Sequence, residues 1–68
     1  MTSDANQEIS QIKGAYITLA THYYERASQW REIRLATEVE REQQEWLRKE
    51  QDCLHRAEAF EKLAKEAT

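Results

Sequence analysis

The sequence has no proline, one glycine and one cysteine among its 68 residues, and it contains no long apolar run. Without proline and with little glycine, nothing in its composition interrupts long helices. The lone Cys53 cannot form a disulfide within the chain, which agrees with a reducing compartment. The longest apolar stretch spans a few residues around Tyr16 to Ala20. We therefore expect neither a membrane span nor a secretory signal, and a cytoplasmic location is the default expectation.

The charge balance is acidic, with 13 Asp and Glu against 10 Lys and Arg and a net charge of −3. This balance argues against a protein that coats nucleic acid, because such binding depends on an excess of basic side chains. The sequence also lacks a glycine-rich phosphate loop, and no nucleophile is accompanied by an evident base and orienting acid. We expect no enzymatic activity and no cofactor.

What the sequence does contain is a helical repeat of apolar residues within a composition rich in helix formers. The repeat changes phase once, between Leu35 and Val39. On a single continuous helix the two stripes would lie about 100° apart, so the pattern predicts two helices. The first stripe is formed by Ile9, Ile12, Tyr16, Leu19, Tyr23, Trp30 and Ile33, and the second by Val39, Trp46, Cys53, Phe60 and Ala67.

Two candidate capping boxes mark where these helices begin. Asp4 is followed by Gln7 just before the first stripe, and Thr37 is followed by Glu40 where the phase fails. We expect Met1 to Ser3 to fray.

The fold class predicted from these signals is all-α, in one domain that spans residues 1–68. Helix one covers about residues 4–35 and helix two about residues 38–67. Their similar lengths, roughly 45 Å each, and short connection favour an antiparallel hairpin. A continuous helix with a stutter is the alternative, because neither glycine nor proline marks the turn.

A chain of this length is near the limit at which one hydrophobic core suffices, so we predict a homodimer. Helix one carries further apolar residues beside its stripe and should contact more than one neighbour. We therefore place it at the centre of a dimeric four-helix assembly, with helix two outside. The candidates for the core and the dimer contact are Ile9, Ile12, Tyr16, Leu19, Tyr23, Trp30, Ile33, Trp46 and Phe60.

Some polar residues suggest chemistry but have simpler explanations. A basic line recurs every seven residues on helix two, and its interleaved acidic residues are typical of a solvated helix face. The residues that could suggest a metal do not converge on one cavity, so we expect no metal. Cys53 lies on the apolar stripe and is best explained as a small buried hydrophobe. The basic line is Arg41, Arg48, His55 and Lys62; the residues considered for a metal are His22, Glu25, Asp52, Cys53 and His55.

Tyr24 and Arg31 are the best candidates for contact with another protein. They lie near the margin of the apolar arc of helix one, and Tyr and Arg supply much of the binding energy at protein interfaces.

The small size, the expected hairpin dimer and the segment ITLATHYYERASQWREIRLA, residues 17–36, resemble the phage-encoded quorum-sensing anti-activators. The resemblance implies an inhibitor that binds the DNA-binding domain of a host transcriptional regulator. In such a complex Glu25, Glu32 or Glu38 would stand in for phosphate charge.

Two other functions remain open. A structural or assembly protein would use the wide face of helix one for larger assembly. A DNA-binding helical dimer would use the basic line on helix two.

Overall fold

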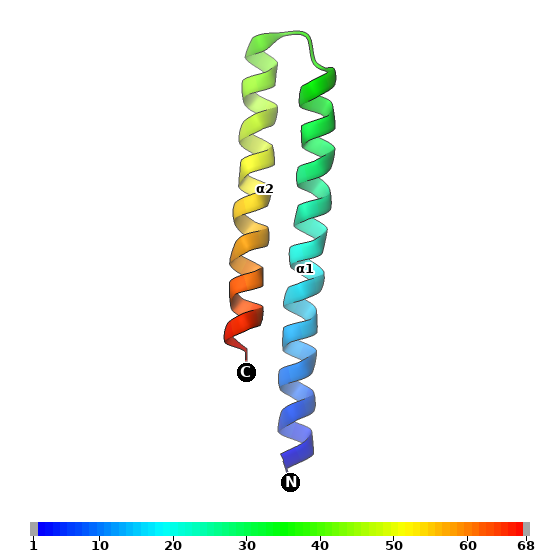
Figure 1. Ribbon diagram of the computed structural model, residues 1–68, viewed down its shortest axis with the longest axis vertical. Coiled ribbons are helices and arrows are strands. Elements are labelled where there is room, and N and C mark those ends of the chain that lie inside the picture. Colours follow the sequence, from blue (N-terminus) through cyan, green and yellow to red (C-terminus); the bar gives the residue numbers. More distant parts are fainter. Residues whose placement is uncertain (1, 68) are drawn as a thin grey trace.

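The protein is a hairpin of two antiparallel helices. A computed structural model describes residues 2–67 of the chain, and the side chains of residues 7–67. Helix α1 spans Thr2–Ala36 and helix α2 spans Glu40–Glu66, with no strand in the part described. The helices lie side by side along a rod of 59 × 14 × 10 Å (Figure 1). The prediction of an all-α, two-helix fold is confirmed, and the alternative of one continuous helix is wrong.

Helix α1 begins earlier than the capping pattern predicts. Asp4 lies inside the helix, two residues after its first residue, Thr2. The prediction that Asp4 caps this helix is therefore wrong. Thr2 and Ser3, which were expected to fray, are also helical, and Met1 lies outside the described residues.

The turn at residues 37–39 is made without glycine. The hydroxyl of Thr37 donates a hydrogen bond to the carbonyl of Ile33 (2.6 Å), so it closes the end of α1 and does not cap α2. The cap of α2 is Val39, in an extended conformation with no side-chain hydrogen bond. The Gln43 side chain donates to the carbonyl of Thr37 and ties the turn to the first turn of α2. The predicted capping box at Thr37 and Glu40 is therefore wrong, and no residue from 2 to 67 needs a positive φ.

The helices pack through small residues. The only apolar side chains buried in the described part are Ala20 and Ala27 of α1 and Cys53, Ala57 and Ala64 of α2. The alanines recur at seven-residue intervals on each helix, as expected of an antiparallel coiled coil. Small side chains at such positions let two helix axes approach closely. The burial of Cys53 confirms that it acts as a small hydrophobe.

This packing divides the apolar stripe predicted on α1. Its aromatic members, Tyr16, Tyr23 and Trp30, face α2 and are half-buried. Its aliphatic members are exposed because the face of α1 that α2 covers is centred on the alanines. The aliphatic side chains lie to one side of that face. These exposed residues are Ile9, Ile12, Leu19 and Ile33.

Candidate functional site

Five aromatic rings fill the space between the helices beside the alanines. Trp30 of α1 stacks on Trp46 of α2 with ring centroids 5.4 Å apart and an interplanar angle of 10°. Phe60 lies between two tyrosines, with its centroid 5.7 Å from that of Tyr23 and 6.1 Å from that of Tyr16. Each ring is only half-buried, so these pairs present apolar surface to solvent.

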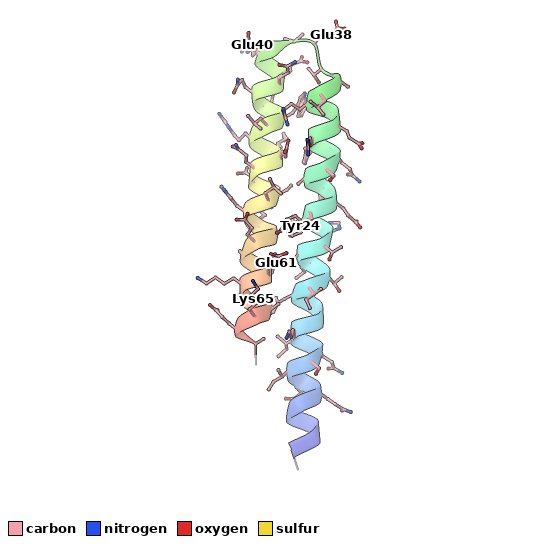
Figure 2. All side chains as sticks on the ribbon, in the orientation of Figure 1. Tyr24, Glu38, Glu40, Glu61 and Lys65 are labelled. Atoms are coloured by element: carbon pink, nitrogen blue, oxygen red, sulfur yellow. The ribbon has the colours of Figure 1, made fainter. Side chains whose placement is uncertain are left out.

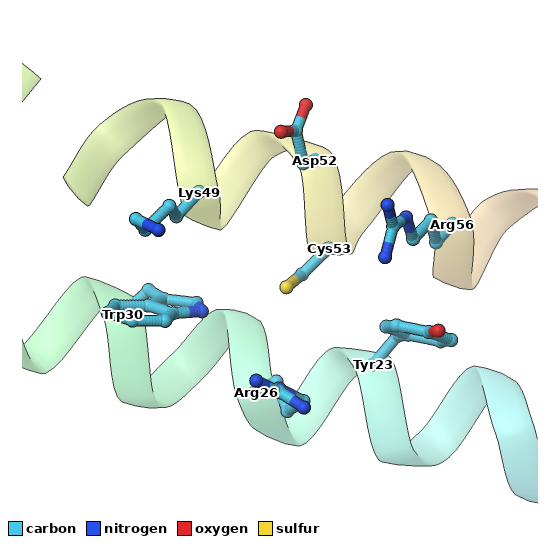
Figure 3. Close-up of a pocket in the computed structure, with 7 residues that line it drawn as sticks. All are labelled: Tyr23, Arg26, Trp30, Lys49, Asp52, Cys53 and Arg56. Atoms are coloured by element: carbon cyan, nitrogen blue, oxygen red, sulfur yellow. The ribbon is translucent and has the colours of Figure 1, made fainter. Parts of the chain in front are cut away.

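Two cations of α2 cover rings of α1. The Lys49 ammonium nitrogen lies 5.2 Å from the centroid of Trp30, and the Arg56 guanidinium carbon lies 5.7 Å from that of Tyr23. Both distances fall within the range of cation–π attraction. Figure 3 shows the Cys53 thiol pointing into the space between the helices and the Asp52 carboxylate pointing away from α1.

These groups line an open hollow of about 220 Å³. Its lining holds three cations, on Arg26, Lys49 and Arg56, and one carboxylate, on Asp52. Among the side chains of residues 7–67 the ion pair that forms is elsewhere, between Arg34 and Glu50. The hollow therefore has a local excess of two positive charges in a chain whose net charge is −3.

Aliphatic residues extend this surface along the rod. Ile12, Leu19 and Ile33 fall in the same seven-residue column of α1 as Arg26, and Leu63 falls in the column of Lys49 and Arg56. All four are exposed, from 39% for Leu19 to 49% for Ile12. We call the whole surface the cationic edge. It consists of Ile12, Leu19, Tyr23, Arg26, Trp30, Ile33, Lys49, Arg56 and Leu63.

The opposite side of the hairpin, the Tyr24 edge, carries two hollows lined by alanines. One, of about 210 Å³, is lined by Tyr24, Ala27, Ser28, Arg31, Glu50 and Leu54. The other, of about 330 Å³, is lined by Lys13, Ile17, Glu61, Ala64 and Lys65. We define the Tyr24 edge by these two sets of residues.

Tyr24 is held within this edge. Burial raises the pKa of its phenol, and so do the neighbouring carboxylates of Glu61 and Glu58. Figure 2 places Tyr24 and Glu61 close together, on α1 and α2 respectively. Tyr24 thus makes a contact within the hairpin.

The structure places the sequence-based partner candidates as follows. Tyr24 and Arg31 line one hollow, as their positions on the helix suggest. Glu25 and Glu32 are exposed on α1, and Glu38 is exposed in the turn at the far end of the rod (Figure 2). At the helical rise, Glu25 and Glu38 are separated by about 20 Å along the rod, so the three glutamates do not form one cluster.

The basic line of α2 is exposed along its whole length, as a solvated face should be. It consists of Arg41, Arg48, His55 and Lys62. Within the described part of the chain, no three His, Cys, Asp or Glu residues gather as metal ligands would. No helix in that part combines the length and apolar character needed to cross a membrane.

Sequence reasoning missed two features of the interface between the helices. The first is the ion pair in which Arg34 Nε donates to Glu50 Oε1 at 3.2 Å, with the Glu50 side chain only 14% exposed. The spacing could have indicated this pair. Arg34 lies seven residues after Ala27, and Glu50 lies seven residues before Ala57, so both continue the columns of the buried alanines. The second is the cationic hollow, whose cations Arg26, Lys49 and Arg56 share columns with exposed aliphatic side chains.

Neither a family model, nor a curated protein, nor a solved structure matches this chain.

Proposed function

We propose that this chain is a non-enzymatic protein-binding module that uses the cationic edge as its binding surface. The observation that carries the proposal is the uneven burial of the hairpin. Its buried residues are small, whereas its aromatic rings are half-buried and Ile12, Leu19, Ile33 and Leu63 lie exposed along one edge.

A partner that covers this edge would remove apolar surface from water along most of the rod. Fully burying one large aliphatic side chain contributes roughly 1.5–3 kcal/mol, and a half-exposed side chain contributes part of that amount. Four aliphatic residues and the exposed parts of the rings would together form the apolar part of such a contact. Tyr, Trp and Arg, the types that dominate binding energy at interfaces, lie at the centre of the edge.

The more specific form of the proposal is an inhibitor or adaptor whose target is a host protein such as a transcriptional regulator. It is supported by the resemblance of residues 17–36 to the anti-activators.

Self-association is the second candidate, and a feature of α1 favours it. Helix α1 has 35 residues and α2 has 27, and Figure 1 shows that the N-terminal part of α1 extends beyond the end of α2. Ile9 and Ile12 lie exposed near this extension. A second copy that paired over this segment would form a homodimer without bringing the cations of the two copies together. Sedimentation equilibrium should then show a dimer that Ile9→Glu dissociates.

Site-specific crosslinking in the native cells tests the main proposal. A photoreactive phenylalanine analogue would replace Leu19 on the cationic edge or, as the control, Arg48 on the outer face of α2. We expect a crosslink to one defined protein from position 19 and none from position 48. Equal crosslinking from both positions, or none from position 19, would show that the cationic edge is not a protein-binding surface.

A further inference from the structure

We infer that the partner segment that covers the cationic edge is an acidic amphipathic helix of a different protein. This inference rests on the proposed function and identifies the chemistry of the partner. It follows from three properties of the edge: its length, the order of its side chains and the sign of its charge.

The length and shape of the edge suit a helix. From Ile12 to Ile33 the edge is about 32 Å long, which a partner helix of about 21 residues would match. The edge follows one column of α1 and one of α2, with a hollow at its centre. A third helix packs naturally against two neighbours that lie side by side. Such a helix would bury its apolar stripe against the exposed rings and aliphatic residues.

The order of side chains along the edge predicts where the partner carries its charges. Aliphatic residues lie toward the ends, Ile12 and Leu63 at one and Ile33 at the other, and the cations lie between them. The matching helix has apolar residues toward both ends and Glu or Asp beside its stripe in the middle. There the carboxylates would reach Arg26, Lys49 and Arg56.

The sign of the charge favours an acidic partner helix over a neutral or basic one. A partner without carboxylates would take part of the hydration from three cations and supply no ion pair in return. Asp52 points away from α1 in Figure 3 and is one carboxylate against three cations. Carboxylates from the partner would complete the ion pairs that the hairpin itself does not form at this edge.

The same argument excludes a second copy as the occupant of the centre of the edge. Two copies related by a two-fold axis would each contribute three cations and one carboxylate to the centre of the contact. Like charges brought together in this way oppose association. A nucleic acid strand would supply anions, but it would leave the aliphatic residues at the ends of the edge without an apolar partner.

Two synthetic peptides provide the test. Both are 21-residue helices with the same leucine stripe, and they differ only beside the stripe, where one carries Glu and the other Lys. Binding is measured by fluorescence anisotropy of a dye on each peptide, at low and at physiological salt. The proteins compared are the unaltered chain, a triple variant of the edge and a triple variant of the outer face. The edge variant is R26Q/K49Q/R56Q, and the matched control, which removes the same number of cations, is R41Q/R48Q/K62Q.

We expect the acidic peptide to bind the unaltered chain and the control variant equally. Its Kd should rise about tenfold in the edge variant, since three partly exposed ion pairs are lost. Salt should weaken binding to the unaltered chain more than binding to the edge variant, and the Lys peptide should not bind. Circular dichroism would establish that all three proteins keep their helices.

Other outcomes would overturn the inference. Equal affinity for the Glu and Lys peptides, equal loss in both triple variants, or binding of a 20-nucleotide DNA strand in place of the acidic peptide would each do so. The proposed function fails separately, if position 19 crosslinks no protein. A protein crosslinked at position 19 together with peptide binding that ignores charge would leave the function standing and reject the acidic helix.

Discussion

The two edges of the hairpin are built from the same two helices but use their polar groups differently. On the Tyr24 edge, groups of α1 meet groups of α2: Tyr24 contacts Glu61, and Glu50 accepts a hydrogen bond from Arg34. On the cationic edge, Lys49 and Arg56 lie over aromatic rings and have no carboxylate partner among the described side chains. On the Tyr24 edge Glu50 and Glu61 thus face groups of the other helix, whereas the cations of the cationic edge remain available to a partner.

Side-chain size accounts for the difference. Ala27 and Ala64 line the hollows of the Tyr24 edge, where the helices approach closely enough for short polar contacts. Rings line the cationic edge and occupy the space that α2 would otherwise fill. The comparison can be tested by changing one edge at a time.

The largest effect should come from overfilling the alanine contact. Ala57 is fully buried, so Ala57→Leu should force the helices apart and lower the free energy of unfolding by about 3 kcal/mol. Ala59→Leu is the control, because Ala59 is exposed two residues away on the same helix. Urea denaturation followed by circular dichroism measures both. Equal stability of the two variants would contradict close packing through the alanines.

A smaller effect should follow from breaking the ion pair. Glu50→Leu leaves the Arg34 guanidinium, 27% exposed, without its partner. Because both groups keep some contact with water, we expect a loss of about 1–2 kcal/mol. The double variant R34L/E50L should be more stable than the sum of the single losses predicts. Additive losses in this double-mutant cycle would mean that the pair is not coupled.

The sequence predicted the coarse fold because the change of phase near Leu35 shows that the apolar residues belong to two helices. It did not predict how far each helix face is covered. The predicted stripe of α1 included the large aliphatic residues Ile12 and Leu19 and left out the alanines, whereas the contact formed around Ala20 and Ala27. Helical periodicity reports which residues are apolar, but how closely two helices approach depends on side-chain volume.

The turn and the candidate site show the same limit. Thr37 and Glu40 have the spacing of a capping box, yet the Thr37 hydroxyl bonds back to Ile33 because α1 continues to Ala36. Tyr24 and Arg31, predicted at the margin of the apolar arc, line a hollow at one edge of the hairpin. The residue spacing within one helix does not show which edge of the hairpin keeps its polar groups free. That depends on the contacts between the two helices.

The cationic edge should be much less sensitive to loss of a single charge. Lys49→Gln removes one exposed cation–π contact with Trp30, which we expect to lower the free energy of unfolding by about 0.5 kcal/mol. Lys62→Gln on the outer face is the matched control and should have no effect on tryptophan fluorescence. A loss above the 1–2 kcal/mol expected for the ion pair would mean that Lys49 serves stability and is not reserved for a partner.

The smallest effect concerns the protonation of Tyr24. The pKa of its phenol is raised above the ordinary value of 10.0, so the neutral form is favoured in the folded hairpin. The contribution to stability is therefore fully present below pH 10 and is lost as the pH rises through the folded pKa. Glu61→Gln removes one of the negative charges and should lower the pKa of Tyr24 toward its ordinary value. The difference in absorbance at 295 nm between each protein and its Tyr24→Phe version isolates this phenol. An unchanged titration in Glu61→Gln would mean that the hydroxyl of Tyr24 is not held by α2, and the contrast between the two edges would lose its clearest polar contact.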